Sequence, residues 1–239
     1  MQAAILCGGE GTRLRPLTYA VPKPLLPLGA KPILEITISR MKEQGFRTFF
    51  LMVNYKADMI KSYFGSGSTF DVDIRYFEEK ERRGTAGPLF QLKGRIDSPI
   101  VVLNADLLTS LKYEQLMKFH EEKGADITVA LKQFRRRIAY GVVDVDENSM
   151  ILSLQEKPEL SYLINSGIYV LSPSVLDLIP YEGEYAMTTL IEDAQKNHLK
   201  VVGYEFTDPW RDIGRMDDYM KALSDIENGE ETDTDGVFR

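Results

Sequence analysis

Residues 3–28 read AAILCGGEGTRLRPLTYAVPKPLLPL, and the predicted fold class follows from them. The first residues, Ala3 to Cys7, form a short apolar run that is typical of a buried strand. The run breaks into a glycine loop, Gly8-Gly9-Glu10-Gly11, whose backbone N–H groups can turn inward around an anion because no Cβ blocks its approach. A strand followed by such a loop predicts an anion site at the carboxyl end of the strand, although ordinary turn glycines would give the same short pattern.

Positive charge follows the glycine loop directly. Thr12 adds a hydroxyl, and Arg13 adds a cation whose forked donors suit phosphate. Lys23 is a second and more mobile cation, set among prolines that exclude a regular helix. We therefore expect a stiffened loop that carries Lys23 along the edge of the same site. Together these residues predict a cradle for a nucleoside triphosphate.

Length and composition indicate one large α/β domain. The chain has 239 residues, of which 44% are hydrophobic, enough for a substantial core. The net charge of −7 gathers at the C-terminal end, where residues 225–239 hold six acids and one arginine. The nearly neutral remainder offers no basic face for nucleic acid. We expect a single domain over residues 1–228 and a flexible acidic tail over residues 229–239.

The sequence lacks the features of membrane-anchored, secreted and zinc-binding proteins. No apolar run reaches the length of a membrane span and no basic segment precedes the first apolar run, so neither a membrane anchor nor a signal peptide is expected. The single cysteine, Cys7, excludes an intramolecular disulfide and favours a cytoplasmic protein. With only His120 and His198, a zinc site or a histidine-based triad is not expected.

Strand and helix patterns alternate along the first half of the chain, which predicts a mostly parallel sheet flanked by helices. Strands are expected over 47–53, 72–77 and 99–103, with helices over 31–45 and through 59–64. Later helices are expected over 113–123, 173–179, 187–196 and 216–227, and later strands over 126–134 and 201–206. Residues 139–143 and 151–155 are expected to form an antiparallel pair, and Arg135-Arg136-Arg137 to lie in a loop.

Two later turns are candidates for ligand binding. Gly84-Thr85-Ala86-Gly87 is a small-residue turn on which a flat base can lie, but it equally suits a helix N-terminus capped by Thr85. Asn104-Ala105-Asp106 follows the apolar strand at 99–103, and open α/β sheets bind ligands at the carboxyl ends of their strands. One or two carboxylates commonly hold Mg²⁺ together with phosphate oxygens, although an acid in this place is also a frequent cap.

The complete string GGEGTRLRPLT, followed by PKPLLPLG, resembles the signature of the sugar-1-phosphate nucleotidylyltransferases. The resemblance continues through the Gly84 turn, Asn104-Ala105-Asp106, Glu156-Lys157-Pro158 and Trp210-Arg211-Asp212-Ile213-Gly214. It implies a Rossmann-like α/β fold of the GT-A type, with a mostly parallel sheet flanked by helices and a small antiparallel sugar-binding lobe. It also implies an enzyme that joins an NTP to a sugar 1-phosphate and releases pyrophosphate.

The resemblance implies roles for individual residues. It implies that Asp106 and Asp212 hold Mg²⁺, and that Arg13, Lys23 and Asp106 are catalytic. The residues it places at the nucleotide are Leu6, Gly8, Gly9, Gly11, Thr12, Arg13, Gly84, Thr85 and Asn104. Those it places at the sugar phosphate are Lys23, Gly141, Glu156, Lys157 and Asn165. Trp210 is expected to be a packing anchor.

Within the family, the segments KPILE, NSGIYVLSPSVLDLIP and MTTLIE look most like the guanylyltransferases for mannose, heptose or amino-sugar 1-phosphates. This favours GTP as the substrate and a product that is a precursor of cell-surface polysaccharide. A uridylyl- or thymidylyltransferase shares the core signature. Two other classes stay open: a glycosyltransferase, which would release NDP, and a non-catalytic nucleotide-sugar-binding regulatory subunit. A homodimer is compatible with the sequence.

Overall fold

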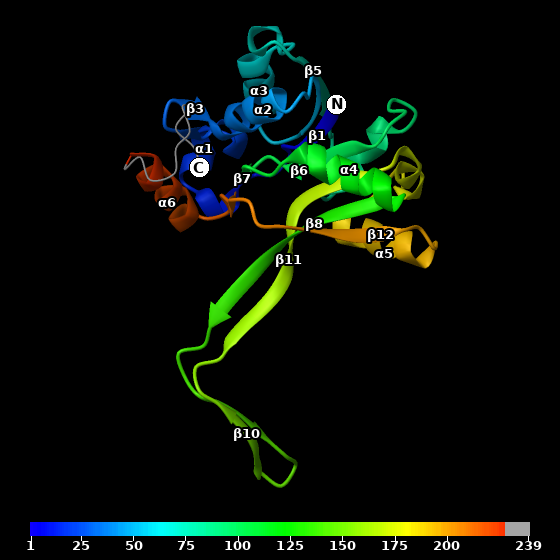
Figure 1. Cartoon of the computed structure of the whole chain (residues 1–239). Helices are drawn as coiled ribbons and strands as arrows, with labels where there is room; N and C mark the ends of the chain where they lie inside the picture. The colour runs from blue at the N-terminus through cyan, green and yellow to red at the C-terminus, as the bar shows by residue number, and fades with distance from the viewer. Residues whose placement is uncertain (228–239) are drawn as a thin grey trace.

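The computed structural model describes residues 1–227 (Figure 1), so the expected acidic tail lies outside the described residues. Within them, seven strands form one sheet in the order β12-β8-β11-β6-β1-β4-β5. β1 (Gln2–Leu6) pairs in parallel with β4 (Thr48–Val53) and β6 (Ile100–Asn104), and β5 (Asp73–Glu78) extends this half beyond β4. β1, β4 and β6 form where apolar runs were expected, because a strand that is covered on both faces needs apolar residues throughout. β5, at the edge of the sheet, instead alternates, with Ile74 buried between the exposed Asp73 and Arg75.

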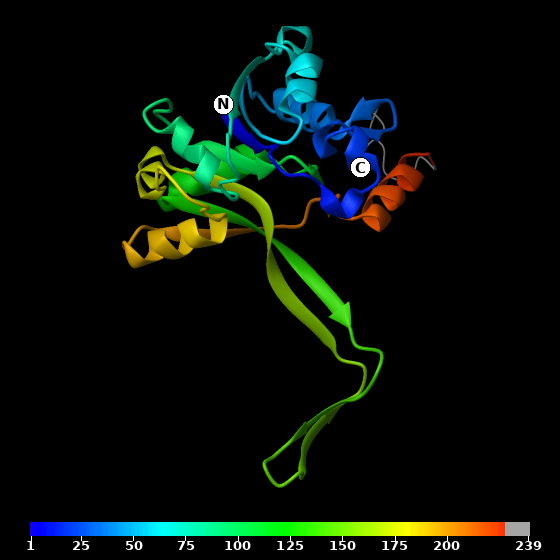
Figure 2. The same cartoon turned by 180° about the vertical axis from the view of Figure 1, so that it is seen from behind.

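The other half of the sheet is mixed in direction. β11 (Glu159–Leu171) runs antiparallel to both β6 and β8 (Ile127–Arg137), and β12 (Val201–Phe206) runs parallel to β8. The outer parts of β8 and β11, with β9 (Val142–Val145) and β10 (Ile151–Gln155) at their tip, project away from the body of the molecule (Figures 1 and 2). The predicted α/β class, with a mostly parallel sheet and an antiparallel lobe, is confirmed.

Helices cover both faces of the sheet, because successive strand residues point to opposite sides. In β1, Ala3 and Ile5 belong to one apolar cluster and Ala4 to another. The first cluster takes in α2 (Ile33–Glu43), α3 (Ala57–Phe64) and α4 (Tyr113–Lys123), while the second takes in α5 (Met187–Lys196). No helix within residues 1–227 has both the length and the apolar composition that a membrane crossing requires.

Short elements complete the chain. The remaining helices are α1 (Leu17–Ala20) and α6 (Met216–Glu227), and 3₁₀ turns occupy Thr12–Leu14, Lys23–Leu25, Ser68–Phe70, Gly87–Leu92 and Pro173–Leu178. Two small antiparallel pairs were not predicted: β2 (Pro27–Leu28) with β3 (Lys31–Pro32), and β7 (Leu107–Thr109) with β13 (Trp210–Asp212).

The loop predicted for Arg135-Arg136-Arg137 is wrong. These arginines continue β8 and lie opposite residues 159–161 of β11, with Arg137 facing Glu159. Opposite charges on facing strands stabilise such a pair, so a basic run can stay in a strand while its side chains remain in water. The helix expected from residue 31 begins instead at Ile33, because Lys31 and Pro32 form β3.

His120 is a buried residue of the core rather than part of a ligand site. It is 2% exposed, and its two ring nitrogens lie 2.8 Å from the Thr128 hydroxyl and 3.1 Å from the Ser172 hydroxyl. Burial lowers the pKa of His120, against the opposing effect of the Glu121 and Asp126 charges. The imidazole is therefore held neutral in the folded protein.

A His120→Gln variant tests this assignment, because glutamine is polar but does not titrate. Below a pH of about 6.5 the unfolded histidine binds a proton that the buried one resists, so acid favours unfolding of the natural protein. Between pH 7.5 and pH 5.5, we expect the free energy of unfolding to fall by about 1 kcal/mol more in the natural protein than in the variant. Urea denaturation at both pH values measures this; equal losses would mean that folded His120 accepts the proton.

Candidate active site

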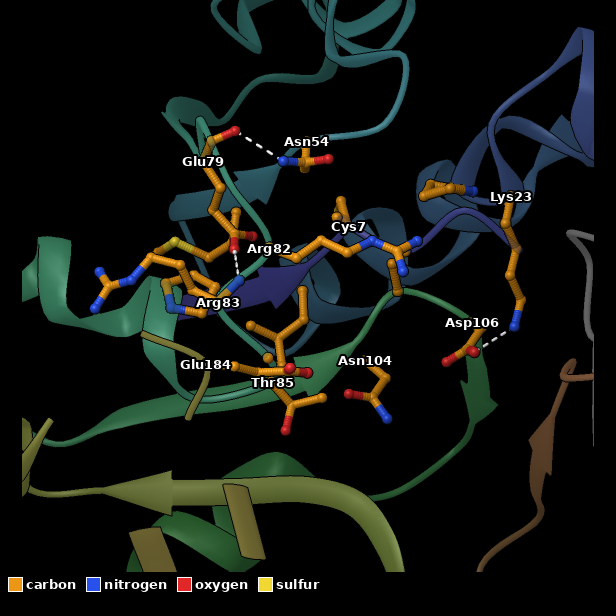
Figure 3. Close-up of a pocket in the computed structure, with 18 residues that line it drawn as sticks. Cys7, Lys23, Asn54, Glu79, Arg82, Arg83, Thr85, Asn104, Asp106 and Glu184 are labelled. Atoms are coloured by element: carbon orange, nitrogen blue, oxygen red, sulfur yellow. Dashed lines mark hydrogen bonds and ion pairs between the residues drawn. The ribbon is translucent and has the colours of Figure 1, made fainter. Parts of the chain in front are cut away.

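The carboxyl ends of β1, β4, β5 and β6 meet at one edge of the sheet, and a cavity of about 320 Å³ opens there (Figure 3). Parallel strands place the residues that follow them side by side, which is why segments far apart in sequence share this cavity. The predicted site residues that line it are Leu6, Gly8, Gly9, Lys23, Gly84, Thr85, Asn104 and Asp106.

Two glycines of the loop, Gly8 and Gly11, are packed too closely to accept side chains, whereas a Cβ on Gly9 would have no atom within 4 Å. A Cβ on Gly8 would lie 2.9 Å from Oε1 of Glu79, and a Cβ on Gly11 would lie 2.9 Å from Cγ2 of Thr18. Gly11 also has a φ of 61°, a conformation that favours glycine, and its carbonyl accepts a hydrogen bond of 2.9 Å from the Thr18 hydroxyl. These contacts fix the path of the loop, and the binding of an anion by the loop stays a prediction.

Lys23 and Asp106 form the charged centre of the site. Lys23 is 8% exposed, and its ammonium donates to Oδ2 of Asp106 (Figure 3). A buried ammonium is costly unless a carboxylate faces it, so each residue explains the position of the other. The second oxygen of Asp106, Oδ1, is buried and has no hydrogen-bond partner among the described residues. That oxygen is therefore available to bind a cation.

Asp212 joins this pair from the far end of the chain. It faces Leu107 across the β13–β7 pair, and the N–H of Ile213 donates to the carbonyl of Asp106 over 2.9 Å. Burial raises the pKa of Asp212, and the charge of Asp106 raises it further, while Lys23 and Arg13 lower it. Two carboxylates and two cations are therefore close enough to influence one another.

Arg13 lies on the Asp212 side of this cluster. A Cβ on Gly214 would lie 3.1 Å from Oδ2 of Asp212 and 3.4 Å from Nη2 of Arg13, so the three groups are neighbours. Trp210 holds this strand in place by donating from Nε1 to the carbonyl of Ser166 over 3.0 Å. The geometry agrees with the packing role expected for Trp210.

The two carboxylates fit a Mg²⁺ ion. Within residues 1–227 no group of three or more metal-binding side chains occurs, so an ion here would take its other ligands from water and phosphate. This is the usual arrangement for Mg²⁺, which prefers few carboxylates and keeps several oxygen ligands from its substrate or from solvent. The unpaired Oδ1 of Asp106 gives the ion a binding atom.

The Gly84 turn contributes Gly84 and Thr85 to the wall of the cavity. The N–H groups of Ala86 and Gly87 both donate to the Tyr185 carbonyl over 3.0 Å, and a Cβ on Gly84 would lie 2.7 Å from that oxygen. Thr85 does not cap the turn that follows it. Its hydroxyl instead accepts a bond of 2.8 Å from the N–H of Met187, the first residue of α5. The prediction that Thr85 caps the helical turn following it is wrong, because its hydroxyl bonds to Met187, which is distant in sequence.

Several cavity residues were not predicted: Asn54, Glu79, Arg82, Arg83 and Glu184. Glu79 could have been found by the rule that drew attention to Asp106, since it follows β5 at the same edge of the sheet.

Glu79 is a second carboxylate of the cavity and is more deeply buried than Asp106. It is 9% exposed, and burial raises its pKa to about 7, although the N–H and the charge of Arg83 act in the other direction. The N–H of Arg83 donates to Oε2 over 3.1 Å, and Oε1 lies against Gly8. The Asn54 amide holds the Glu79 backbone through a bond of 2.8 Å to its carbonyl (Figure 3).

The residues predicted for the sugar phosphate are divided between two places. Asn165 lies near the body, where its Oδ1 accepts from the N–H of Gly167 and its Nδ2 donates to the Tyr169 hydroxyl, both over 2.9 Å. Gly141, Glu156 and Lys157 lie on the projecting hairpin and are exposed. In the described part of the chain they do not line the cavity.

With this geometry in view, comparison with known proteins assigns the family. Residues 2–229 match the family model described as nucleotidyl transferase. The chain belongs to the nucleotidyl transferase family. The family predicted from the GGEGTR signature and Lys23 is thereby confirmed.

Named relatives differ in the base they use. The chain is 36% identical, over 95% of its length, to a UTP–glucose-1-phosphate uridylyltransferase of Synechocystis, and 33% identical, over 96%, to a mannose-1-phosphate guanylyltransferase of Mycobacterium tuberculosis. It spans only 63% and 65% of those two proteins. It is also 36% identical to a D-glycero-α-D-manno-heptose 1-phosphate guanylyltransferase of Campylobacter jejuni, covering 93% of this chain and 99% of that one.

Solved structures show the same fold. HddC from Yersinia pseudotuberculosis superimposes with a TM-score of 0.73 at 26% identity, over 93% of this chain and 98% of that one. A further structure of HddC is a complex with GMP-PN. A protein from Bacillus anthracis, described as a putative glucose-1-phosphate thymidylyltransferase, gives a TM-score of 0.74 at 23% identity over 94% of each chain, which supports the fold alone.

A Glu79→Gln variant tests the environment of this carboxyl. Because the folded pKa is raised above that of the unfolded chain, Glu79 favours folding at low pH, and this contribution is lost as the pH rises through about 7. We expect Glu79→Gln to raise the melting temperature by a few degrees at pH 8, since about 1 kcal/mol shifts it by ~2–4 °C, and by less at pH 5. The exposed neighbour, in Glu78→Gln, should not show this pH dependence. A gain at pH 5 equal to that at pH 8 would contradict a raised pKa.

Proposed function

We propose that this chain is a sugar-1-phosphate nucleotidylyltransferase that joins GTP to a sugar 1-phosphate, giving a GDP-sugar and pyrophosphate. The observation that carries the proposal is the cluster of Lys23, Asp106, Asp212 and Arg13 beside the glycine loop. Two carboxylates and two cations at a loop built for an anion suit the transfer of a nucleotidyl group, in which positioning and neutralisation of charge do most of the work.

The chemistry requires little from the protein in covalent terms. An oxygen of the sugar 1-phosphate attacks the α-phosphorus of GTP, and the bond from that phosphorus to the bridging oxygen breaks with its electron pair leaving on pyrophosphate. The attacking oxygen is already an anion, so no general base is needed. This agrees with His120 being a neutral core residue. A Mg²⁺ ion held by Asp106 and Asp212 would supply positive charge to the α-phosphate.

The chain's own cations have separate roles in this proposal. Lys23, fixed by Asp106, would orient the α-phosphate and the incoming sugar phosphate. Arg13, beside Asp212, would stabilise the departing pyrophosphate. The N–H groups of the glycine loop would hold the remaining phosphate oxygens. Lys157 and Glu156 would bind the sugar phosphate and the sugar hydroxyls.

Guanine is the proposed base because of Glu79. An ionised carboxylate only accepts hydrogen bonds, and the guanine edge offers two neighbouring donors, N1–H and the N2 amino group. Uracil and thymine offer a single N–H between two acceptors, which a carboxylate matches poorly. Glu79 and the Gly84 turn both line the cavity, and the N–H of Arg83 at the start of that turn donates to Oε2 of Glu79. A base bound by Glu79 would therefore lie beside the Gly84 turn. The relatives named as guanylyltransferases support the same base.

The proposed setting of the reaction follows from its substrates. GTP and sugar 1-phosphates are charged small molecules of the cytoplasm, and we place the protein there. The heptose 1-phosphate relative, whose length this chain almost matches, supports a heptose or related sugar and a product used for cell-surface polysaccharide. We propose one catalytic domain over residues 1–228.

The experiment is a pyrophosphate-release assay with Mg²⁺, each of five NTPs, and a mixed pool of hexose, hexosamine and heptose 1-phosphates. Release with GTP, followed by mass analysis of the GDP-sugar, is the expected result. Release with UTP or dTTP alone would keep the reaction and contradict the assignment of the base. Release of NDP from a nucleotide sugar would indicate a glycosyltransferase. No release with any pair would favour a binding or regulatory subunit.

Asp106→Asn should lower kcat by about 10²–10³-fold. The amide keeps the shape of the side chain but removes the negative charge that faces Lys23 and would bind the metal. Steady-state kinetics under saturating GTP and Mg²⁺ measure this. Asp71→Asn is the matched control, since that carboxylate is exposed on the surface with its side chain 85% accessible. A kcat for Asp106→Asn within a few-fold of the natural value would remove Asp106 from the catalytic centre.

Glu79→Gln should lower the preference for GTP over UTP, measured as the ratio of their kcat/KM values, by about 10-fold or more. The amide replaces one acceptor with a donor that meets a donor of guanine and suits an acceptor of uracil. Glu78→Gln should leave the ratio unchanged, because its side chain pairs with Lys61 outside the cavity. An unaltered ratio in Glu79→Gln would show that another group reads the base.

A further inference from the structure

The hairpin formed by residues 133–163, which we call the arm, has no core of its own. It comprises the outer parts of β8 and β11 together with β9 and β10, and it projects from the body (Figures 1 and 2). None of the residues 133–163 is buried. A two-stranded hairpin without a covered face is only marginally stable in water, so an arm of this length needs a surface to lie on.

Large apolar side chains on the arm are open to solvent. Tyr140, Ile151, Leu152 and Leu154 are between 64% and 78% exposed, and Tyr162 is 58% exposed. Scattered apolar residues are normal on a protein surface, but a contiguous apolar patch on two paired strands marks an interaction site. The arm therefore has the composition of a surface that is covered in the working protein.

The body of the same chain does not cover the arm. Within residues 1–227, the hydrogen bonds and ion pairs described for the arm join residues of the arm itself. Examples are Ser153 to Asp144, over 2.6 Å, and Gln133 to Ser161, over 3.2 Å. The arm is also the part of the chain that carries Glu156 and Lys157, whose 3.7 Å ion pair lies in solvent.

The active site is incomplete without those two residues. The cavity of one chain is lined by Gly8, Gly9, Glu79 and Asp106. The charged pair proposed for the sugar phosphate is absent from that lining and lies on the projecting arm (Figures 1 and 2). An arm directed away from its own cavity can complete the cavity of a second copy. This step rests on the proposed function, because it takes Glu156 and Lys157 to be substrate-binding residues.

Charge along the arm favours a second copy of the same chain as the occupant. Its base carries Arg135-Arg136-Arg137, with Glu159 opposite Arg137, while residues 144–157 towards and around the tip carry four carboxylates and one lysine. In a two-fold dimer each surface meets itself in the opposite direction, so that the acidic tip of one arm approaches the basic base of the other. A self-complementary distribution of this kind is what an isologous interface requires.

We propose that the chain acts as a two-fold dimer in which the arm of each copy lies across the other copy and completes its active site with Glu156 and Lys157. The apolar side chains of the arm are buried in this interface. Each active site then combines the Lys23–Asp106–Asp212 cluster of one copy with the arm of its partner.

The mass of the protein in solution gives the first test. We expect light scattering after size exclusion to give twice the chain mass of 27.2 kDa. An Ile151→Ser/Leu152→Ser double variant should shift the protein to one chain and reduce activity, without loss of the far-ultraviolet circular dichroism of the body. Met220→Ser, on α6, removes an apolar side chain of similar exposure outside the arm and should leave the mass unchanged. A natural protein that is monomeric at assay concentrations would overturn the proposal.

Mixed dimers test whether the arm works in the partner. One chain carries Asp106→Asn and the other carries Glu156→Ala/Lys157→Ala, and the two are co-expressed with different tags and purified through both. If arms are exchanged, each mixed dimer has one intact site and should show about half of the natural activity, while either variant alone stays inactive. If each arm serves its own chain, neither site is intact and the mixed dimer is inactive.

The remaining outcomes of the mixed-dimer experiment also test the exchange of arms. Failure to recover a doubly tagged dimer, or full activity of Glu156→Ala/Lys157→Ala alone, would overturn the proposal. Neither result contradicts the proposed function, provided that the natural protein releases pyrophosphate. An arm that folds back to serve its own chain would give an inactive mixed dimer from an active natural protein.

Discussion

The ion pair between Lys23 and Asp106 is the contact on which the arrangement of the site depends. An ammonium this deeply buried is stable only where a carboxylate meets it, and that carboxylate comes directly after the central strand β6. Lys23 is held in reach because the prolines on either side restrict the backbone around a short 3₁₀ turn. Through its carbonyl, Asp106 also receives the N–H of Ile213, which brings Asp212 to the same place. These two contacts, both made by Asp106, join three segments that are far apart in the chain.

The electrostatics of this centre suit an anionic substrate. In the chain itself, burial and the charge of Asp106 raise the pKa of Asp212, and Lys23 and Arg13 lower it. In the proposed reaction, the charges of a nucleoside triphosphate and its metal would act on both carboxylates and both cations of this centre. Backbone N–H groups of a glycine loop can bind an anion without a charged side chain. The net charge of −7 of the whole chain is therefore compatible with the proposed anion site.

Much of the fold could be predicted from the sequence because its signals are local. The apolar strand runs and the amphipathic helices at 113–123 and 187–196 lie where their periodicity places them. Errors arose where the deciding partner is distant in sequence: Thr85 bonds to Met187, and the arginines at 135–137 stay in a strand because Glu159 and its neighbours face them. Glu79 was missed because an acid after a strand is common, and only the closure of the cavity around it distinguishes it. The direction of the arm could not be predicted, since alternating apolar residues indicate a covered face without saying what covers it.

Metal binding in the presence of nucleotide tests the central claim most directly, because it depends on the two carboxylates and not on the identity of the sugar. Mn²⁺, a paramagnetic substitute for Mg²⁺, can be titrated against the protein by electron paramagnetic resonance with and without GTP. We expect weak binding of Mn²⁺ alone and much tighter binding with GTP, lost by at least about tenfold in Asp106→Asn and in Asp212→Asn because each removes a charged ligand. Equal binding of Mn²⁺ and GTP by the natural protein and by both variants would show that these carboxylates do not hold the metal.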